Sequence, residues 1–193
     1  MLAAAAFALA ACSKNDNNAA DTTGAASSTA MGADTSAMTS ANTSNTLSDA
    51  NIVAILDEAN MADSAAGSIA VAKGTSSAVR DYGRQMMRDH HSLRAQGQAL
   101  AKKLNVTPQA PANDPLAADI QANTNTLNST AKGKDFDKAY IDAEVATHKK
   151  VLQIATDAMG QAQNTELKNL IQKAAPLLQA HLDKAESIQK NLK

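Results

Sequence analysis

Apolar residues recur every three or four positions from about residue 48 to residue 192, which is the spacing of helices that bury one face. Residues that favour turns divide this pattern into five segments. Gly74, Gly133 and Gly160 each follow one segment, and prolines between residues 108 and 115 separate the second from the third. The sequence therefore predicts helices over residues 48–73, 76–105, 116–131, 135–159 and 165–192.

Four of these helices are long, and the third is shorter and more polar. The first two and the last two are joined by short turns, which favours two antiparallel hairpins linked by a longer connection. We therefore predict an all-α fold, a ferritin-like four-helix bundle with one crossover that contains a short extra helix. Pro176 lies inside the last helix, where we expect a kink.

Ionisable side chains interrupt the apolar stripes of the four long helices. On a helical wheel, Asp63 lies near the middle of the first stripe, His90 in the second and His181 in the last, while Glu144 and His148 both fall within the fourth segment's stripe. Such groups cost several kcal/mol each in a core unless they are paired, hydrogen-bonded or bound to metal. At about 1.5 Å per residue, all five fall in the middle half of the bundle. This placement favours one internal site.

Imidazole and carboxylate groups from separate helices suit a single transition-metal ion, with zinc, copper and iron as candidates. A di-iron centre needs glutamate three residues before histidine on two helices. Met87 and Leu178 occupy those positions before His90 and His181, so a dinuclear centre is not favoured. Two alternatives stay open. The five groups can form a hydrogen-bonded network that only fixes helix register, or some of them can be partly exposed.

Composition argues against other classes of function. The net charge is −1 and aromatic residues make up 2% of the chain, so we predict no nucleic-acid partner. No serine elbow, available cysteine nucleophile or glycine-rich phosphate loop is recognisable. Arg80, Arg84 and Arg88 form a line pointing away from the core, which we interpret as a solvated face. The sequence leaves open whether the chain is an enzyme and favours a function without catalysis.

The N-terminal segment has the features of an export signal. Residues 1–11 form a short apolar stretch before Cys12, the single cysteine, and this stretch is too short to span a bilayer. Leu9-Ala-Ala-Cys12 resembles the lipobox of bacterial lipoproteins, which implies a lipid anchor to the membrane at Cys12. No Lys or Arg precedes the apolar run, so we expect the true start to lie upstream. Ser13 after the cysteine favours, by the same resemblance, the outer membrane.

Between the predicted anchor and the helices, the chain is rich in Ala, Ser, Thr, Asn, Asp and Gly without periodicity. Such a stretch buries too little apolar surface to fold, so we predict a disordered linker over residues 12–47. A flexible coil of about 35 residues has a reach of roughly 30–35 Å. The predicted organisation is thus a signal peptide over 1–11, a lipidated linker over 12–47 and a bundle over 48–193.

Three ordered motifs in the helices are similar to the signatures of one bacterial family. The motifs are Val79-Arg-Asp-Tyr-Gly-Arg-Gln-Met-Met-Arg-Asp-His90, Phe136-Asp-Lys-Ala-Tyr140 followed by His148, and Pro176-Leu-Leu-Gln-Ala-His181-Leu. The family is domain-of-unknown-function family 4142, often described as an outer-membrane protein and grouped with ferritin-like folds. The resemblance covers about residues 49–188 and implies fold and export. It supplies no activity, because a fold does not imply one.

The leading hypothesis is therefore an outer-membrane lipoprotein that faces the periplasm and holds a metal ion in its bundle. Its role would be metal handling or envelope stress tolerance. The alternative is a structural or partner-binding envelope module with a buried polar network and an unknown protein partner. A third, less favoured hypothesis is a metal-dependent oxidase or peroxide scavenger.

Overall fold

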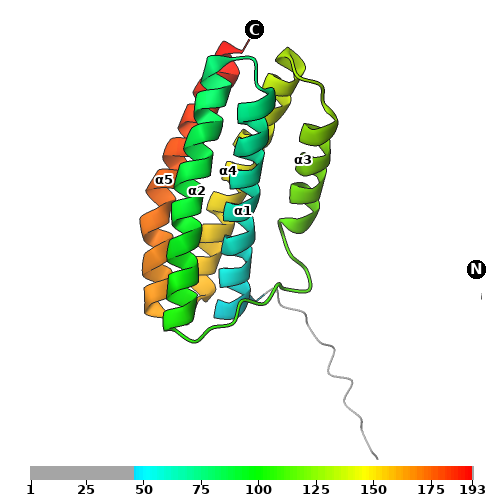
Figure 1. Ribbon diagram of the computed structural model, residues 1–193. Coiled ribbons are helices and arrows are strands. Elements are labelled where there is room, and N and C mark those ends of the chain that lie inside the picture. Colours follow the sequence, from blue (N-terminus) through cyan, green and yellow to red (C-terminus); the bar gives the residue numbers. More distant parts are fainter. Residues whose placement is uncertain (1–45, 193) are drawn as a thin grey trace, which may run out of the picture. The chain divides into compact units, whose positions relative to one another are not determined.

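A computed structural model describes residues 46–192. These residues form helices joined by irregular segments, without strands (Figure 1). The predicted signal peptide, Cys12 and all but the last two residues of the predicted linker lie outside these described residues. The helices are α1 (Asp49–Lys73), α2 (Ser77–Lys103), α3 (Ala117–Ser129), α4 (Lys134–Gln161) and α5 (Thr165–Asn191). The five predicted helices are confirmed, each bound falling within two residues of its expected position.

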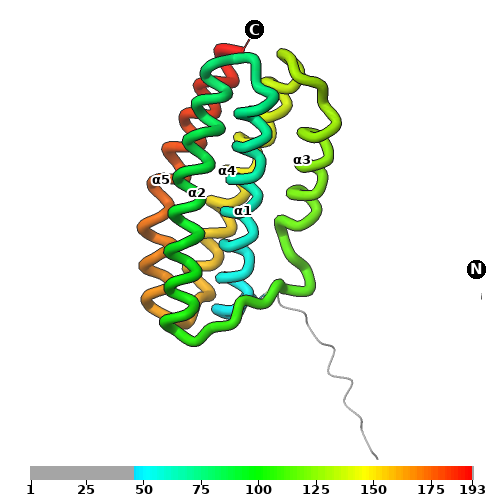
Figure 2. Tube along the Cα trace, viewed as in Figure 1, coloured from blue at the N-terminus to red at the C-terminus, as the bar shows by residue number. Residues whose placement is uncertain are grey.

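Two antiparallel hairpins, α1–α2 and α4–α5, form the bundle. The trace in Figure 2 shows that α2 and α4 run in the same direction, so the chain must travel back along the bundle before α4 begins. The segment that carries α3 makes this return, and α3 packs against α1 and α4. Further contacts join α1 to α4 and α2 to α5. The predicted bundle with one crossover and a short extra helix is therefore confirmed.

Local caps explain where two of the long helices begin. Ser48 and Asn51 form a reciprocal capping box, in which the Asn51 backbone N–H donates to Ser48 Oγ at 3.2 Å and the Ser48 N–H donates to Asn51 Oδ1 at 3.1 Å. Asn164 Oδ1 accepts from the backbone N–H groups of Glu166 and Leu167 at the start of α5. These contacts satisfy backbone donors that a helix leaves unpaired at its first turn.

Two residues that we expected to interrupt helices, Gly160 and Pro176, lie inside them. We expected Gly160 to end the fourth segment, but α4 continues through it to Gln161. Gly160 is exposed within the helix, where glycine costs only about 1 kcal/mol relative to alanine, too little to end a helix that packing supports. α5 also continues through Pro176, and the kink expected there stays a prediction.

The crossing of α1 and α2 brings two glycines into backbone contact. A Cβ atom added to Gly83 would lie 2.7 Å from the carbonyl oxygen of Gly67, and one added to Gly67 would lie 2.6 Å from the carbonyl oxygen of Gly83. Only residues without a side chain permit this approach. The close crossing holds α1 and α2 together about one helical turn after Asp63 and two turns before His90.

A buried carboxylate ties the turn between α1 and α2 to the start of α4. Asp137 is 2% exposed and accepts hydrogen bonds from the Thr75 N–H at 2.8 Å, the Thr75 hydroxyl at 2.5 Å and the Ser76 N–H at 2.7 Å. The two hairpins are thereby joined at one end of the bundle.

Along residues 46–192, no helix combines the length and the apolar character needed to cross a bilayer.

Candidate metal centre

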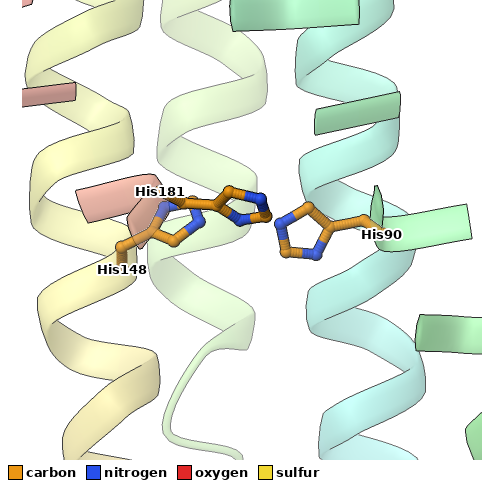
Figure 3. Close-up of side chains that lie close together, drawn as sticks. All are labelled: His90, His148 and His181. Carbon is orange, nitrogen blue, oxygen red and sulfur yellow. The ribbon is translucent and has the colours of Figure 1, made fainter. Parts of the chain in front are cut away.

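Three imidazole rings from three helices meet in the middle of the bundle. Figure 3 shows His90 of α2, His148 of α4 and His181 of α5 pointing toward one another. Their ring centroids are separated by 5.6 Å (His90–His148), 5.2 Å (His90–His181) and 5.4 Å (His148–His181). One nitrogen of each ring lies within 4.8 Å of the others, and none of the three residues is more than 1% exposed. The structure thus brings together the three histidines that the sequence analysis singled out.

Each ring is oriented by a hydrogen bond at one nitrogen. His90 Nδ1 lies 2.9 Å from Asn60 Oδ1, His181 Nε2 lies 2.9 Å from Asp89 Oδ2, and His148 Nδ1 lies 3.0 Å from the backbone carbonyl oxygen of Glu144. All three partners are oxygen acceptors, so the hydrogen-bond pattern assigns the proton of each neutral ring to that nitrogen. The other nitrogen of each ring then carries a lone pair.

These lone-pair nitrogens have no hydrogen-bond partners. They are His90 Nε2, His148 Nε2 and His181 Nδ1, and all three are fully buried. A buried acceptor without a partner costs about 1–3 kcal/mol, so three in one place need an explanation. Metal-binding histidines have this arrangement, with one nitrogen facing the ion and the other donating to an oxygen that fixes the ring.

Two buried carboxylates, Asp63 of α1 and Glu144 of α4, lie beside the histidines. Asp63 Oδ2 is 3.6 Å from His90 Nε2, and Glu144 Oε2 is 3.4 Å from His148 Nδ1. Asp63, Glu144 and His148 each offer an atom within 4.8 Å of the others, so His148 belongs to both the imidazole group and this carboxylate group. All five residues that the sequence placed on inner faces therefore lie in one buried cluster.

Burial favours the neutral forms of His90 and His181. It lowers the pKa of His90 to about 4, an effect that Asp63 opposes and that the positive charges of His148 and His181 reinforce. It also lowers the pKa of His181, where the hydrogen bond to Asp89 acts in the opposite direction. Both rings are therefore neutral at pH 7, which is the form that binds metals.

The pKa of Glu144 is shifted in the opposite direction. Burial and the neighbouring negative charge of Asp63 raise the pKa of Glu144 well above its usual range, while the phenols of Tyr140 and Tyr82 act against this rise. Glu144 Oε2 has no hydrogen-bond partner. A nearby cation would favour the ionised form of this carboxylate, because opposite charges at short distance lower a carboxyl pKa.

The chain's two tyrosines close the cluster on one side. The rings of Tyr82 and Tyr140 pack edge to face with centroids 6.1 Å apart, and both are fully buried. The Tyr82 hydroxyl donates to the backbone carbonyl of His181 at 3.2 Å, whereas the Tyr140 hydroxyl has no partner. In the sequence analysis both tyrosines appear only within the family motifs, with no role at the site.

Sequence reasoning also missed Asn60 and Asp89, the two side chains that orient His90 and His181. Asp89 directly precedes His90, and Asn60 lies one turn before Asp63. Their positions next to core ionisable residues were the available signal, because a buried imidazole needs an acceptor for its N–H group.

The donor set fits a transition metal. Three imidazole nitrogens with carboxylates nearby are ligands that zinc, copper and iron accept. Zinc–nitrogen bonds are about 2.0–2.1 Å long, so nitrogens within 4.8 Å of one another need only small ring movements to share an ion. Residues 46–192 therefore contain a preformed group of ligands that can hold one metal ion.

Comparison with known proteins gives a family and no activity. Residues 33–188 match the model of a family described as "Domain of unknown function (DUF4142)". The match begins within the predicted linker and ends near the end of α5. Neither a curated protein nor a solved structure shows significant similarity to the chain.

Proposed function

We propose that this chain, which belongs to the DUF4142 family, binds a single transition-metal ion in the core of its bundle. The ligands are His90, His148 and His181, assisted by Glu144 and Asp63. One observation carries this proposal. The three buried rings each bring one nitrogen within 4.8 Å of the others, and each ring has one nitrogen without a hydrogen-bond partner while its opposite nitrogen is held by an oxygen.

The surroundings of the site favour retention of an ion over turnover of an organic substrate. The three histidines and Glu144 are at most 2% exposed and Asp63 is 5% exposed, so a large substrate has no route to them without separation of the helices. Closed metal sites are typical of ions that stabilise a fold, whereas catalytic ions keep an open coordination position. We therefore propose a role in metal handling or in tolerance of envelope stress, with zinc, copper or iron as the ion.

The test is elemental analysis of untagged protein, with thermal melting before and after chelation. We expect close to one equivalent of metal and a lower Tm in the chelated protein, because an ion bound only by the folded state stabilises it. His148→Ala should lose the metal. His91→Ala is the matched control, since His91 is exposed and directly follows His90. Full metal content in His148→Ala would show that this ligand is wrongly assigned.

The alternative function is a structural or partner-binding module without a metal. It is favoured by the observation that each ring already has one hydrogen-bond partner, which lets the cluster specify how the helices align. A purified bundle that contains no metal, and whose Tm does not change with added zinc, copper or iron, would support this alternative.

We also propose that the chain is an outer-membrane lipoprotein whose bundle faces the periplasm. The support is the apolar segment that ends at Cys12 and the polar stretch that follows it. Cys12→Ala should move the protein from the membrane fraction to the soluble fraction. An unchanged distribution between the fractions would reject the lipid anchor.

A further inference from the structure

A small apolar cavity adjoins the histidine cluster. It lies between α1, α2, α4 and α5 and has a volume of about 50 Å³. Asp63 and His90 line the cavity and are buried, so they mark its deep end, whereas Gly97 and Ala174 line it and are partly exposed. The cavity therefore extends from the space between α2 and α5 toward the proposed metal ligands.

We infer that this cavity binds a small, uncharged, apolar molecule of the size of dioxygen and places it beside His90. The inference goes beyond metal binding and does not depend on it, because every wall of the cavity is formed by the protein. If an ion also binds, the cavity supplies the neighbouring position for a molecule that reaches the ion.

The volume and the walls of the cavity select the occupant. A cavity of about 150 Å³ lined by Leu, Ile and Phe stays dry and binds benzene or xenon. A volume about one third as large accommodates a molecule of two or three heavy atoms. Val151, Ile171 and Leu178 contribute side chains that offer water no hydrogen bonds.

Five polar residues also line the cavity, but Arg94 is paired with Asp57 and His90 with Asn60, which leaves Asp63 as the remaining polar side chain. The mainly apolar walls therefore favour an apolar occupant over water.

The outer end of the cavity is defined by small residues and one ion pair. A Cβ atom added to Gly97 would meet no atom within 4 Å, so space remains beside this part of α2. Arg94 and Asp57, which also line the cavity, form a two-point ion pair between α2 and α1, with Nε–Oδ1 2.9 Å and Nη2–Oδ2 3.1 Å. This pair holds one edge of the opening, and a larger side chain at Gly97 should fill the space next to it.

The test uses xenon as the probe on metal-free full-length chain, observed through the methyl resonances of Ile, Leu and Val. We expect saturable shifts for Val151, Ile171 and Leu178. Methyl groups in the opposite half of the core, such as those of Ile141 and Ile188, should not shift. Because the sample is metal-free, failure of the metal proposal leaves this result unaffected.

A matched pair of variants tests the location. Gly97→Leu should abolish the xenon-induced shifts. Gly160→Leu is the control, because Gly160 is also helical and faces open space but lies outside the cavity, and it should leave the shifts unchanged. Shifts that persist at full size in Gly97→Leu would overturn the assignment of the opening.

Dioxygen itself provides a measurement that needs no variant. Dissolved dioxygen is paramagnetic, so it should increase the relaxation of the Val151, Ile171 and Leu178 methyl protons more than that of equally buried methyl protons of Ile141 and Ile188. Uniform relaxation across these methyl groups, or an absence of xenon shifts in the unmodified chain, would overturn the proposal.

Discussion

The orientation of the imidazole rings depends on residues that are themselves not candidate ligands. Asn60 is fixed by its own amide, whose Nδ2 donates to the Leu56 carbonyl at 2.6 Å and so directs Oδ1 toward His90. Asp89 reaches His181 from α2, although the Asp89 side chain is 26% exposed. A hydrogen bond of this type raises the basicity of a ligand ring and fixes its tautomer.

We predict that Asp89→Asn weakens zinc binding by about 10–100-fold, the usual effect of changing a residue that orients a metal ligand. The asparagine retains the size of the side chain and removes its charge, so folding should be little affected. Competition titration against a zinc-binding dye measures the affinity. Asp81→Asn is the control, because Asp81 is exposed on the same helix and pairs with Arg84. Equal zinc affinity in Asp89→Asn and the unmodified chain would contradict this role.

The candidate ligands were predictable from sequence, whereas their orienting partners were not. A helix has a fixed angular step, so spacing alone placed His90 and His148 on inward faces. Asp89 is one such step away from His90, and its contact with His181 depends on how closely α2 and α5 approach. That distance is set by packing between hairpins, which local spacing does not encode.

The contact between α1 and α2 depends on the glycines at their crossing. We predict that Gly83→Ala lowers the free energy of unfolding by about 1–3 kcal/mol, because the added methyl group forces the two backbones apart. Gly160→Ala should instead raise it by about 0.5–1 kcal/mol, since Gly160 lies in an open helical position where alanine is preferred. Urea denaturation measures both. Destabilisation of similar size at the two positions would show that the crossing is not tightly packed.

The turn between α1 and α2 depends on Asp137. We predict that Asp137→Ala lowers the free energy of unfolding by about 2–3 kcal/mol, because the N–H groups of Thr75 and Ser76 lose their buried acceptor. Asp135→Ala changes an exposed residue two positions earlier in α4 and should alter stability by no more than about 0.5 kcal/mol. Urea denaturation of both variants makes the comparison, and equal stability would remove Asp137 from the contacts that join the hairpins.

Sequence pattern located the helices well but described their burial less well. Apolar periodicity and turn residues predicted each of the five helices, because helix capping and apolar spacing depend on residues only a few positions apart. Leu56 lies at helical spacing on the same side of α1 as Asp63 but is only partly buried, whereas Val53 and Ile55 are buried. The reason is tertiary, since α1 is covered by α2, α3 and α4 together. A single apolar stripe cannot describe a helix with neighbours on several sides.

The stability of the whole bundle should depend on pH through its buried histidines. The pKa of His90 is about 4 in the folded chain and 6.5 ordinarily, so the unfolded chain takes up a proton as pH falls through 6.5 and the folded chain does not until about pH 4. This proton should lower the free energy of unfolding by about 3 kcal/mol over that range. Burial of His181 acts in the same direction.

Glu144 has the opposite sign, because its raised pKa makes its contribution favourable at low pH and lost as pH rises above 4.5. The contribution of His90 to the pH dependence is therefore measured by comparing variants with the unmodified chain. The free energy of unfolding of the metal-free proteins is determined by urea denaturation from pH 7 to pH 4.5. His90→Gln should show a shallower loss of stability than the unmodified chain. His91→Gln, at the exposed neighbouring histidine, should keep the original slope. Identical slopes in all three proteins would mean that folding does not lower the pKa of His90.

The direction of the helices gives the bundle two different ends. The first described residues lie beside the turn between α4 and α5, where Asp49 accepts hydrogen bonds from the Gln163 and Asn164 N–H groups, whereas Leu192 lies at the opposite end (Figure 1). With α5 spanning 27 residues, entry and exit of the chain are about 40 Å apart. In a lipid-anchored chain, a fluorescent label after Leu192 would report how upright the bundle stands, since an upright bundle with its first described residues toward the bilayer holds this label at least about 40 Å from the membrane.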